Sequence, residues 1–146
     1  MRKLRWGILS TAKIGLDKVI PALQRCADSE VVVIASRDPD RAAQAALRLG
    51  IACAYGSYEA LLADPDIDAV YNPLPNHLHV PLTLAAMRAG KHVLCEKPMA
   101  MNAAELDVLR PLTTSVHLQE AFMVRHHAQW LAARQAIRDG AIGICA

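Results

Sequence analysis

The sequence alternates short apolar runs with longer Ala- and Leu-rich stretches of helical period, and this alternation constrains the fold more than any other feature. A chain in which strands and helices alternate with short connections forms a parallel sheet. Each crossover helix carries the chain back to the end of the sheet where the previous strand began. Residues 31–35, Val-Val-Val-Ile-Ala, are apolar throughout, as a strand covered on both faces requires. The sequence therefore predicts an α/β fold with a doubly wound parallel sheet, in the strand order 3-2-1-4-5-6.

The expected elements follow from periodicity and from helix start and stop signals. We expect strands at residues 4–9, 31–35, 52–55, 68–72, 91–95 and 116–120. We expect helices at residues 13–26, 39–49, 79–89, 102–109 and 126–138, with one more beginning after Ser57. Pro21 is expected to kink the first helix, Gly50 to end the second, and Asn102 to cap the helix at 102–109. Such a sheet binds ligands beyond the carboxyl ends of its first and fourth strands.

Composition excludes several other classes of protein. A hydrophobic content of 53% with 21% charged residues is typical of a globular chain and excludes a disordered regulator. The sixteen Lys and Arg residues are scattered and balanced by fourteen Asp and Glu, so neither a nucleic acid nor a membrane is an expected partner. The apolar run after the basic start is too short for a signal peptide or a membrane span, so we expect a cytoplasmic protein.

Neither the cysteines nor the histidines predict a metal site. Cysteines 26, 53, 95 and 145 form no Cys-x-x-Cys pair, and their apolar neighbours are typical of buried free thiols rather than of disulfides. His77 and His79 are two residues apart and would point to different sides of a helix, and the adjacent His126 and His127 fail the same test.

The turn from the first strand to the first helix is a candidate dinucleotide site. The fingerprint Gly-x-Gly-x-x-Gly is matched there by Ser10-Thr-Ala-Lys-Ile-Gly15, which keeps only the third glycine. Hydroxyl donors and a helix N-terminus favour an anion at this turn. The candidate cofactor-binding residues are Ser10, Thr11, Ala12, Lys13 and Ile14. The alternative is a turn that merely joins a strand to a helix.

The end of the second strand bears on the choice of nucleotide. An acidic residue about twenty positions beyond the fingerprint would bind a ribose 2′-hydroxyl, but Ser36 and Arg37 occupy this place. A hydroxyl and a guanidinium suit a 2′-phosphate, so NADP is favoured and NAD stays possible. A solvated Arg37 in an ordinary turn is the alternative.

Three further segments lie at carboxyl ends of expected strands. Tyr71-Asn-Pro-Leu-Pro-Asn-His77 supplies Asn72, Leu74, Asn76 and His77 as candidate cofactor contacts, unless its prolines and the helix cap at Asn76 are purely structural. Glu96-Lys97-Pro98 follows the fifth strand, and Arg125 follows the sixth. A lysine beside a nicotinamide can pass a proton to a substrate oxygen during hydride transfer, whereas a surface Glu-Lys pair contributes little. We therefore count Lys97 as the candidate catalytic residue and Glu96, Lys97 and Arg125 as candidate cofactor contacts.

Taken together, these segments resemble the Gfo/Idh/MocA oxidoreductase family, and within it the branch of dimeric dihydrodiol and xylose dehydrogenases. The resemblance rests on Trp6-Gly-Ile-Leu-Ser-Thr-Ala-Lys-Ile14, Tyr71-Asn-Pro-Leu-Pro-Asn76, Gly90-Lys-His-Val-Leu-Cys-Glu-Lys-Pro98 and Glu120-Ala-Phe-Met-Val-Arg-His126. It implies a Rossmann NAD(P)-binding fold and oxidation of a sugar, polyol or diol, or the reverse reduction. It also implies that Lys97 binds and protonates the reacting oxygen, and that the peptide before Pro98 is cis.

The resemblance also sets an expectation about domains. Residues 1–120 would form the dinucleotide-binding domain, and residues 121–146 a connecting helix and the truncated start of a second domain with a large sheet. In this family that second domain supplies the rest of the substrate pocket, another catalytic residue and usually the dimer interface. Homodimerisation is therefore expected only where that domain is present. The alternative function is a catalytically inactive fragment that binds nucleotide or a partner.

Overall fold

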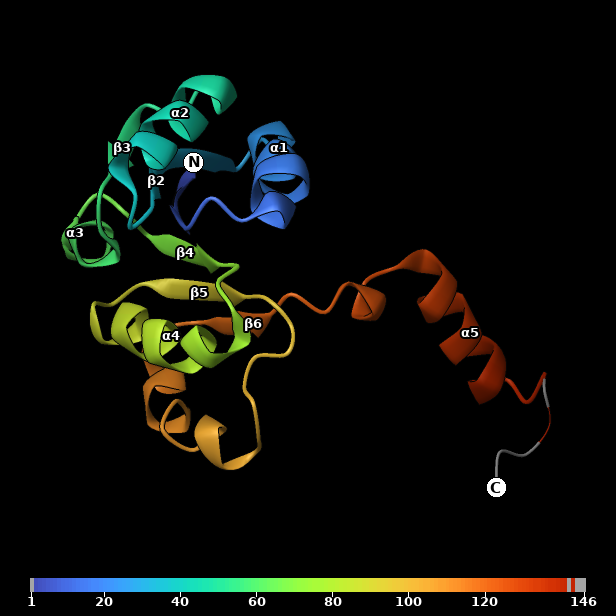
Figure 1. Cartoon of the computed structure of the whole chain (residues 1–146). Helices are drawn as coiled ribbons and strands as arrows, with labels where there is room; N and C mark the ends of the chain where they lie inside the picture. Colours follow the sequence, from blue (N-terminus) through green and yellow to red (C-terminus); the bar gives the residue numbers. More distant parts are fainter. Residues whose placement is uncertain (1, 142, 144–146) are drawn as a thin grey trace.

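The computed structural model describes residues 2–141 and 143, and a six-stranded sheet forms its centre (Figure 1). The strands are β1 (Leu4–Leu9), β2 (Ser29–Ala35), β3 (Cys53–Tyr55), β4 (Ala69–Asn72), β5 (His92–Cys95) and β6 (Leu118–Glu120). They lie in the order β3-β2-β1-β4-β5-β6, and all five pairings are parallel. The predicted strand order is confirmed.

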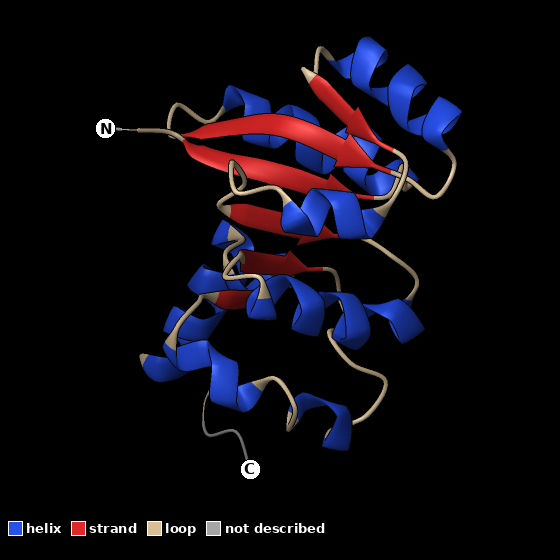
Figure 2. Cartoon of the chain, turned by 90° about the vertical axis from the view of Figure 1, so that its left-hand side faces the viewer, coloured by secondary structure: helices blue, strands red, loops and turns tan. Residues whose placement is uncertain are grey.

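Helices cover both faces of this sheet (Figure 2). The α-helices are α1 (Ile20–Arg25), α2 (Pro39–Leu49), α3 (Tyr58–Ala63), α4 (His79–Arg88) and α5 (Ala128–Arg138). Shorter helical turns are η1 (Gly15–Val19), η2 (Asn76–Leu78), η3 (Ala104–Leu106), η4 (Arg110–Thr114) and η5 (Met123–Arg125). The last helix, α5, lies apart from the sheet (Figure 1). None of the helices in the described ranges is both long and apolar enough to span a bilayer.

Consecutive residues of one strand pack into hydrophobic layers on opposite faces of the sheet. Ile8 packs with Ile20 and the inner face of α2, whereas Leu9 packs with the layer under α3 and α4. Val33 and Ile34 divide in the same way. Side chains of a strand alternate between faces, so a sheet covered on both sides needs apolar residues at consecutive positions.

The first helix differs from the regular helix expected over residues 13–26. Residues 15–19 form a π-helical turn closed by a hydrogen bond from the Ile20 N–H to the Gly15 carbonyl, and α1 begins only after it. Pro21 lies in the first turn of α1, where its missing N–H costs least. Residues 13–25 are thus helical throughout, as predicted, except that the helix contains a π-helical turn. The kink expected at Pro21 stays a prediction.

The prediction for residues 102–109 is wrong, because only the 3-10 turn η3 forms in place of a regular helix. Asn102 still accepts a hydrogen bond from the Glu105 N–H at 3.1 Å. Pro111 lies in the first turn of η4, where its missing N–H costs least.

The cysteines also differ from expectation. Cys95 is buried, but Cys26 and Cys53 are exposed free thiols, because one ends a helix and the other lies in an edge strand. Cys145 lies outside the described residues.

An ion-pair cluster ties β1 to the residues before β4. Asp68 accepts a hydrogen bond from the Arg5 backbone N–H at 2.9 Å and lies 2.9 Å from the Arg2 guanidinium. Burial raises the pKa of the Asp68 carboxyl, but hydrogen bonds from Arg5 and Arg2 outweigh burial and lower it to about 2. A carboxyl whose pKa falls on folding stabilises the native state above its unfolded pKa and loses this effect as the pH falls.

We therefore expect the Asp68→Asn variant to lose about 1–2 kcal/mol of unfolding free energy at pH 7, a range reduced for partial solvent screening. The difference from the unsubstituted chain should shrink between pH 4 and pH 2, where the native carboxylate becomes protonated. Urea titrations across this pH range measure the difference in unfolding free energy, with Asp66→Asn as the control because that side chain is 81% exposed. A difference that does not change with pH would contradict the assignment.

Candidate functional site

The turn after β1 has the geometry that the dinucleotide fingerprint requires, although two of its glycines are absent. Ser10 stands at the first glycine position and adopts a φ of 76°, in the left-handed region. Its Oγ accepts a hydrogen bond from the Ala12 N–H at 3.2 Å, and its own N–H donates to the Ala35 carbonyl at 2.8 Å. These two bonds hold a conformation that costs a non-glycine residue about 1–2 kcal/mol.

Gly15, at the third fingerprint position, packs close to β4. A Cβ at this position would lie 3.4 Å from a ring carbon of Tyr71 and 3.7 Å from Pro73. The helix that follows β1 therefore begins in contact with β4. Between β1 and β4 the chain reverses the direction in which it winds across the sheet.

An open pocket of about 500 Å³ brings several of the predicted residues together at the carboxyl ends of the strands. Its lining includes the predicted residues Ser10, Thr11, Ala12, Ser36, Arg37 and Leu74. Asp38, Arg41, Tyr58 and the two prolines beside Leu74 complete the lining and were not predicted as site residues. The arrangement joins the ends of β1, β2 and β4 in one site.

Arg41 gives this pocket a second guanidinium beside Arg37. It lies in the first turn of α2, 3.9 Å from the Asp38 carboxylate, and its side chain is largely exposed. Its only sequence signal was its spacing of three from Asp38, which places it in the first turn of the helix expected over residues 39–49. Asp38 caps α2 by accepting from the N–H groups of Asp40 and Arg41, and the Ser36 Oγ accepts from the Asp38 N–H.

The donors of this pocket suit a phosphorylated nucleotide. Hydroxyl groups, a turn leading into a helix and two guanidinium groups offer hydrogen bonds and positive charge to phosphate oxygens. Ser36 and Arg37 occupy the position after β2 where an acidic side chain would bind a ribose 2′-hydroxyl, and the carboxylate of the next residue, Asp38, caps α2. The residues present therefore fit NADP.

A second pocket, of about 540 Å³, opens beside the first along the ends of β5 and β6. Its lining is mostly apolar and includes Ile14 and Glu96 from the predicted set. The other apolar residues of its lining are Val19, Leu94, Ala121, Phe122 and Met123.

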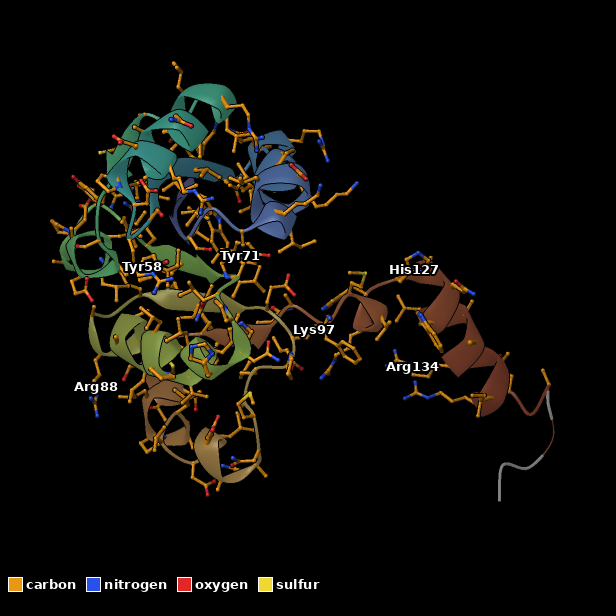
Figure 3. The ribbon with its side chains drawn as sticks, viewed as in Figure 1. Tyr58, Tyr71, Arg88, Lys97, His127 and Arg134 are labelled. Atoms are coloured by element: carbon orange, nitrogen blue, oxygen red, sulfur yellow. The ribbon has the colours of Figure 1, made fainter. Side chains whose placement is uncertain are left out.

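Lys97 lies next to this second pocket, on the loop that leaves β5 (Figure 3). Its side chain is exposed, and its peptide bond to Pro98 is cis, as the resemblance implies. Glu96 is fixed from below by the Tyr71 hydroxyl, which donates to its Oε1 at 2.8 Å. Burial, together with this bond to Glu96, raises the pKa of the Tyr71 hydroxyl, so Tyr71 remains a donor.

Asn72 lies below the pocket rather than in its lining. It is fully buried, and its Oδ1 accepts from the Leu74 N–H at 3.3 Å. Its Nδ2 donates to the His79 carbonyl at 3.1 Å and to the Thr83 hydroxyl at 3.2 Å. Sequence reasoning considered His79 only as a metal ligand, and in the described residues no cluster of three potential metal ligands forms.

Besides Asn72 and Lys97, four predicted residues lie outside the two pockets. Lys13 is exposed and faces Asp17 at 3.8 Å, and Asn76 and His77 lie in the exposed turn η2. Asn76 does not cap α4, because that helix begins at His79 without a side-chain cap. Arg125 ends the turn η5 beyond β6 and borders α5.

Relatives and solved structures with the same arrangement are oxidoreductases. An uncharacterized oxidoreductase from Rhizobium meliloti is 51% identical, over 98% of this chain and 43% of its own length. D-xylose 1-dehydrogenase (NADP(+)) 2 from Haloferax volcanii is 52% identical, over 85% of this chain and 38% of its own. A 3-ketoreductase from Actinomadura kijaniata, solved with TDP-benzene and NADP, superposes with a TM-score of 0.90 at 38% identity, covering 97% of this chain and 45% of that one.

This chain thus spans less than half the length of the relatives that it matches. The family model described as "Oxidoreductase family, NAD-binding Rossmann fold" matches residues 4–126. On this match and the strand order of the sheet, the chain belongs to the Gfo/Idh/MocA oxidoreductase family.

Proposed function

We propose that this chain is the NADP-binding portion of an oxidoreductase that acts on a sugar, a polyol or a diol. The observation that carries the proposal is the single pocket in which the turn after β1, the Ser36-Arg37 pair and Leu74 meet. Support for the nucleotide comes from the NADP-dependent xylose dehydrogenase and from the ketoreductase solved with NADP. Support for the substrate class comes from relatives named for xylose, for a dTDP-sugar and for a dihydrodiol.

In this proposal the residues divide into two groups. Ser10, Thr11, Ala12, Ser36 and Arg37 hold the nucleotide, and Ile14 and Glu96 border the apolar pocket where its reactive ring would lie. Bound NADP supplies hydride chemistry. The Lys97 ammonium binds the substrate oxygen and gives it a proton as the carbon accepts hydride, and takes that proton back in the oxidative direction.

We assign different roles to the remaining predicted contact residues. Asn72 supports the pocket from below, whereas Lys13, Asn76, His77 and Arg125 would reach the nucleotide or substrate only by side-chain movement from the surface.

We further propose that residues 1–120 form the nucleotide-binding domain and that residues 121–146 lead into a second domain. The position of α5, apart from the sheet, supports this division (Figure 1). Homodimerisation would require that domain.

A second candidate function is binding without turnover. The match to these curated relatives covers 38–43% of their length and includes the pocket proposed for the nucleotide. A chain of this kind would bind nucleotide, or a partner, and leave it unchanged.

Substituting Arg37 tests the nucleotide assignment. We expect the Arg37→Ala variant to weaken NADP binding about 10- to 100-fold, the value of a charge-assisted hydrogen bond, while NAD binding changes little. Calorimetric titration of both nucleotides measures this, with Arg88→Ala as the control because that exposed arginine ends α4 (Figure 3). An unsubstituted chain that binds neither nucleotide refutes the proposal, and one that prefers NAD refutes the role of Arg37.

Substituting Lys97 separates the two candidate functions. With NADP and a panel of aldoses, polyols and diols, we expect turnover that the Lys97→Met variant lowers by at least about 100-fold, in the range typical of general acid-base catalysis. NADP binding by the variant should stay within about 3-fold of the unsubstituted chain, since Lys97 does not line the nucleotide pocket. NADP binding with no turnover on any member of the panel would favour the binding-only candidate.

A further inference from the structure

His79 lies buried between the two loops that form the proposed site. Its ring is 1% exposed, and its two nitrogens face different loops. Nδ1 lies 2.7 Å from the carbonyl oxygen of Pro98, and Nε2 lies 2.6 Å from the carbonyl oxygen of Leu74. Both distances are within hydrogen-bonding range.

Each of these carbonyls belongs to a segment with a part in the proposed function. Leu74 lines the nucleotide pocket, and Pro98 directly follows Lys97. The two segments leave different strands, β4 and β5, which are adjacent in the sheet. One imidazole ring therefore links the nucleotide pocket to the loop that carries Lys97.

The backbone of His79, which carries the ring, is itself held in place. Asn72 donates to the His79 carbonyl and to Thr83, and it accepts from the Leu74 N–H. His79 is also the first residue of α4, so its backbone belongs to a packed helix. A rigid ring on an anchored backbone can fix the distance between two loops, which a flexible chain with a single donor cannot.

The chemistry of the ring explains why a histidine serves here. Carbonyl oxygens only accept hydrogen bonds, so each contact needs a proton on the facing nitrogen. Either neutral tautomer donates to one loop, and the doubly protonated ring donates to both. An aliphatic side chain of similar volume would fill the space but leave the buried Leu74 carbonyl and the partly buried Pro98 carbonyl without this donor, at a cost in local stability.

We propose that His79 is a positioning residue that holds the Leu74 segment and the Lys97-Pro98 loop at a fixed separation. The consequence for Lys97 rests on the proposed function, whereas the bridge between the two loops does not. His79 touches neither substrate nor nucleotide in this proposal and acts through the two backbone carbonyls that it contacts.

Amide hydrogen exchange of the full chain, measured without nucleotide, tests the bridge. In the His79→Leu variant we expect exchange to accelerate about 10-fold in both residues 73–78 and residues 97–101, with less change in β1 and β2, because the loss is local. The His79→Gln variant, which keeps one amide donor, should give an intermediate rate in at least one of the two segments. If the leucine variant does not fold, the glutamine variant carries the test.

The Thr83→Val variant is the matched control. Thr83 lies on the same helix, is also fully buried and bonds the same Asn72, but it contacts neither carbonyl that the ring faces. We expect this variant to leave exchange in residues 97–101 close to that of the unsubstituted chain. Unchanged exchange in the His79→Leu variant, uniform acceleration across the sheet, or equal acceleration in the Thr83→Val variant would each overturn the proposal.

A parallel NADP titration keeps the two proposals apart. We expect the His79→Leu variant to bind NADP several-fold more weakly than the unsubstituted chain, since Leu74 lines the nucleotide pocket. Failure of the unsubstituted chain to bind NADP would contradict the proposed function, while the exchange rates would still decide the bridge. Accelerated exchange with unchanged NADP affinity would support the bridge but overturn the expected effect of the Leu74 segment on the nucleotide pocket.

Discussion

The parallel pairing of β1 with β2 on one side and with β4 on the other is the constraint on which the rest of the structure depends. Leu9 lies opposite Ala35 in one pairing, and Ile8 lies opposite Tyr71 in the other. This register brings the ends of three strands to the same level at one edge of the sheet. Because the chain turns in opposite directions after β1 and β4, the loops diverge there and leave a crevice. Both pockets of the candidate site open along that edge.

Backbone at such an edge is no longer paired within the sheet, so the loops need other partners. The Ser10 N–H reaches the Ala35 carbonyl, and the Glu96 N–H reaches the Asn72 carbonyl. Beyond these, buried side chains supply the bonds, with Asn72 and His79 below the loops and Tyr71 below Glu96. No buried side-chain nitrogen or oxygen in the described part of the chain lacks a partner. Hydrogen bonds within the protein thus hold in place the loops that would contact a ligand.

Much of the fold was accessible from the sequence because its signals are local. The strand at residues 4–9, the stop at Gly50 and the helix cap at Ser57 depend on nearby residues, and the structure confirms all three. The prediction differs from the structure in the detail of two helices. Only the 3-10 turn η3 forms in place of the regular helix expected after Asn102, and a π-helical turn lies inside the first helix, before Pro21.

The burial of Cys26 and Cys53 was predicted wrongly for a different reason. Apolar neighbours in sequence do not report whether a residue lies at a helix end or in an edge strand. The candidate site shows the same limit. Arg41 carried only a spacing signal, and nothing local to His79 indicated that its ring would reach Pro98, nineteen residues further along the chain.

The sequence by itself determined the class of fold, the order of the strands and the polar residue types that follow each strand. These depend on periodicity and on residue type, both of which act over a few neighbouring positions. Only the tertiary structure decided that Ser10, Ser36 and Leu74 share one pocket and that one imidazole joins the loops after β4 and β5. The physical reason is that such contacts depend on strand register and crossover geometry, which place residues from distant parts of the chain within hydrogen-bonding distance.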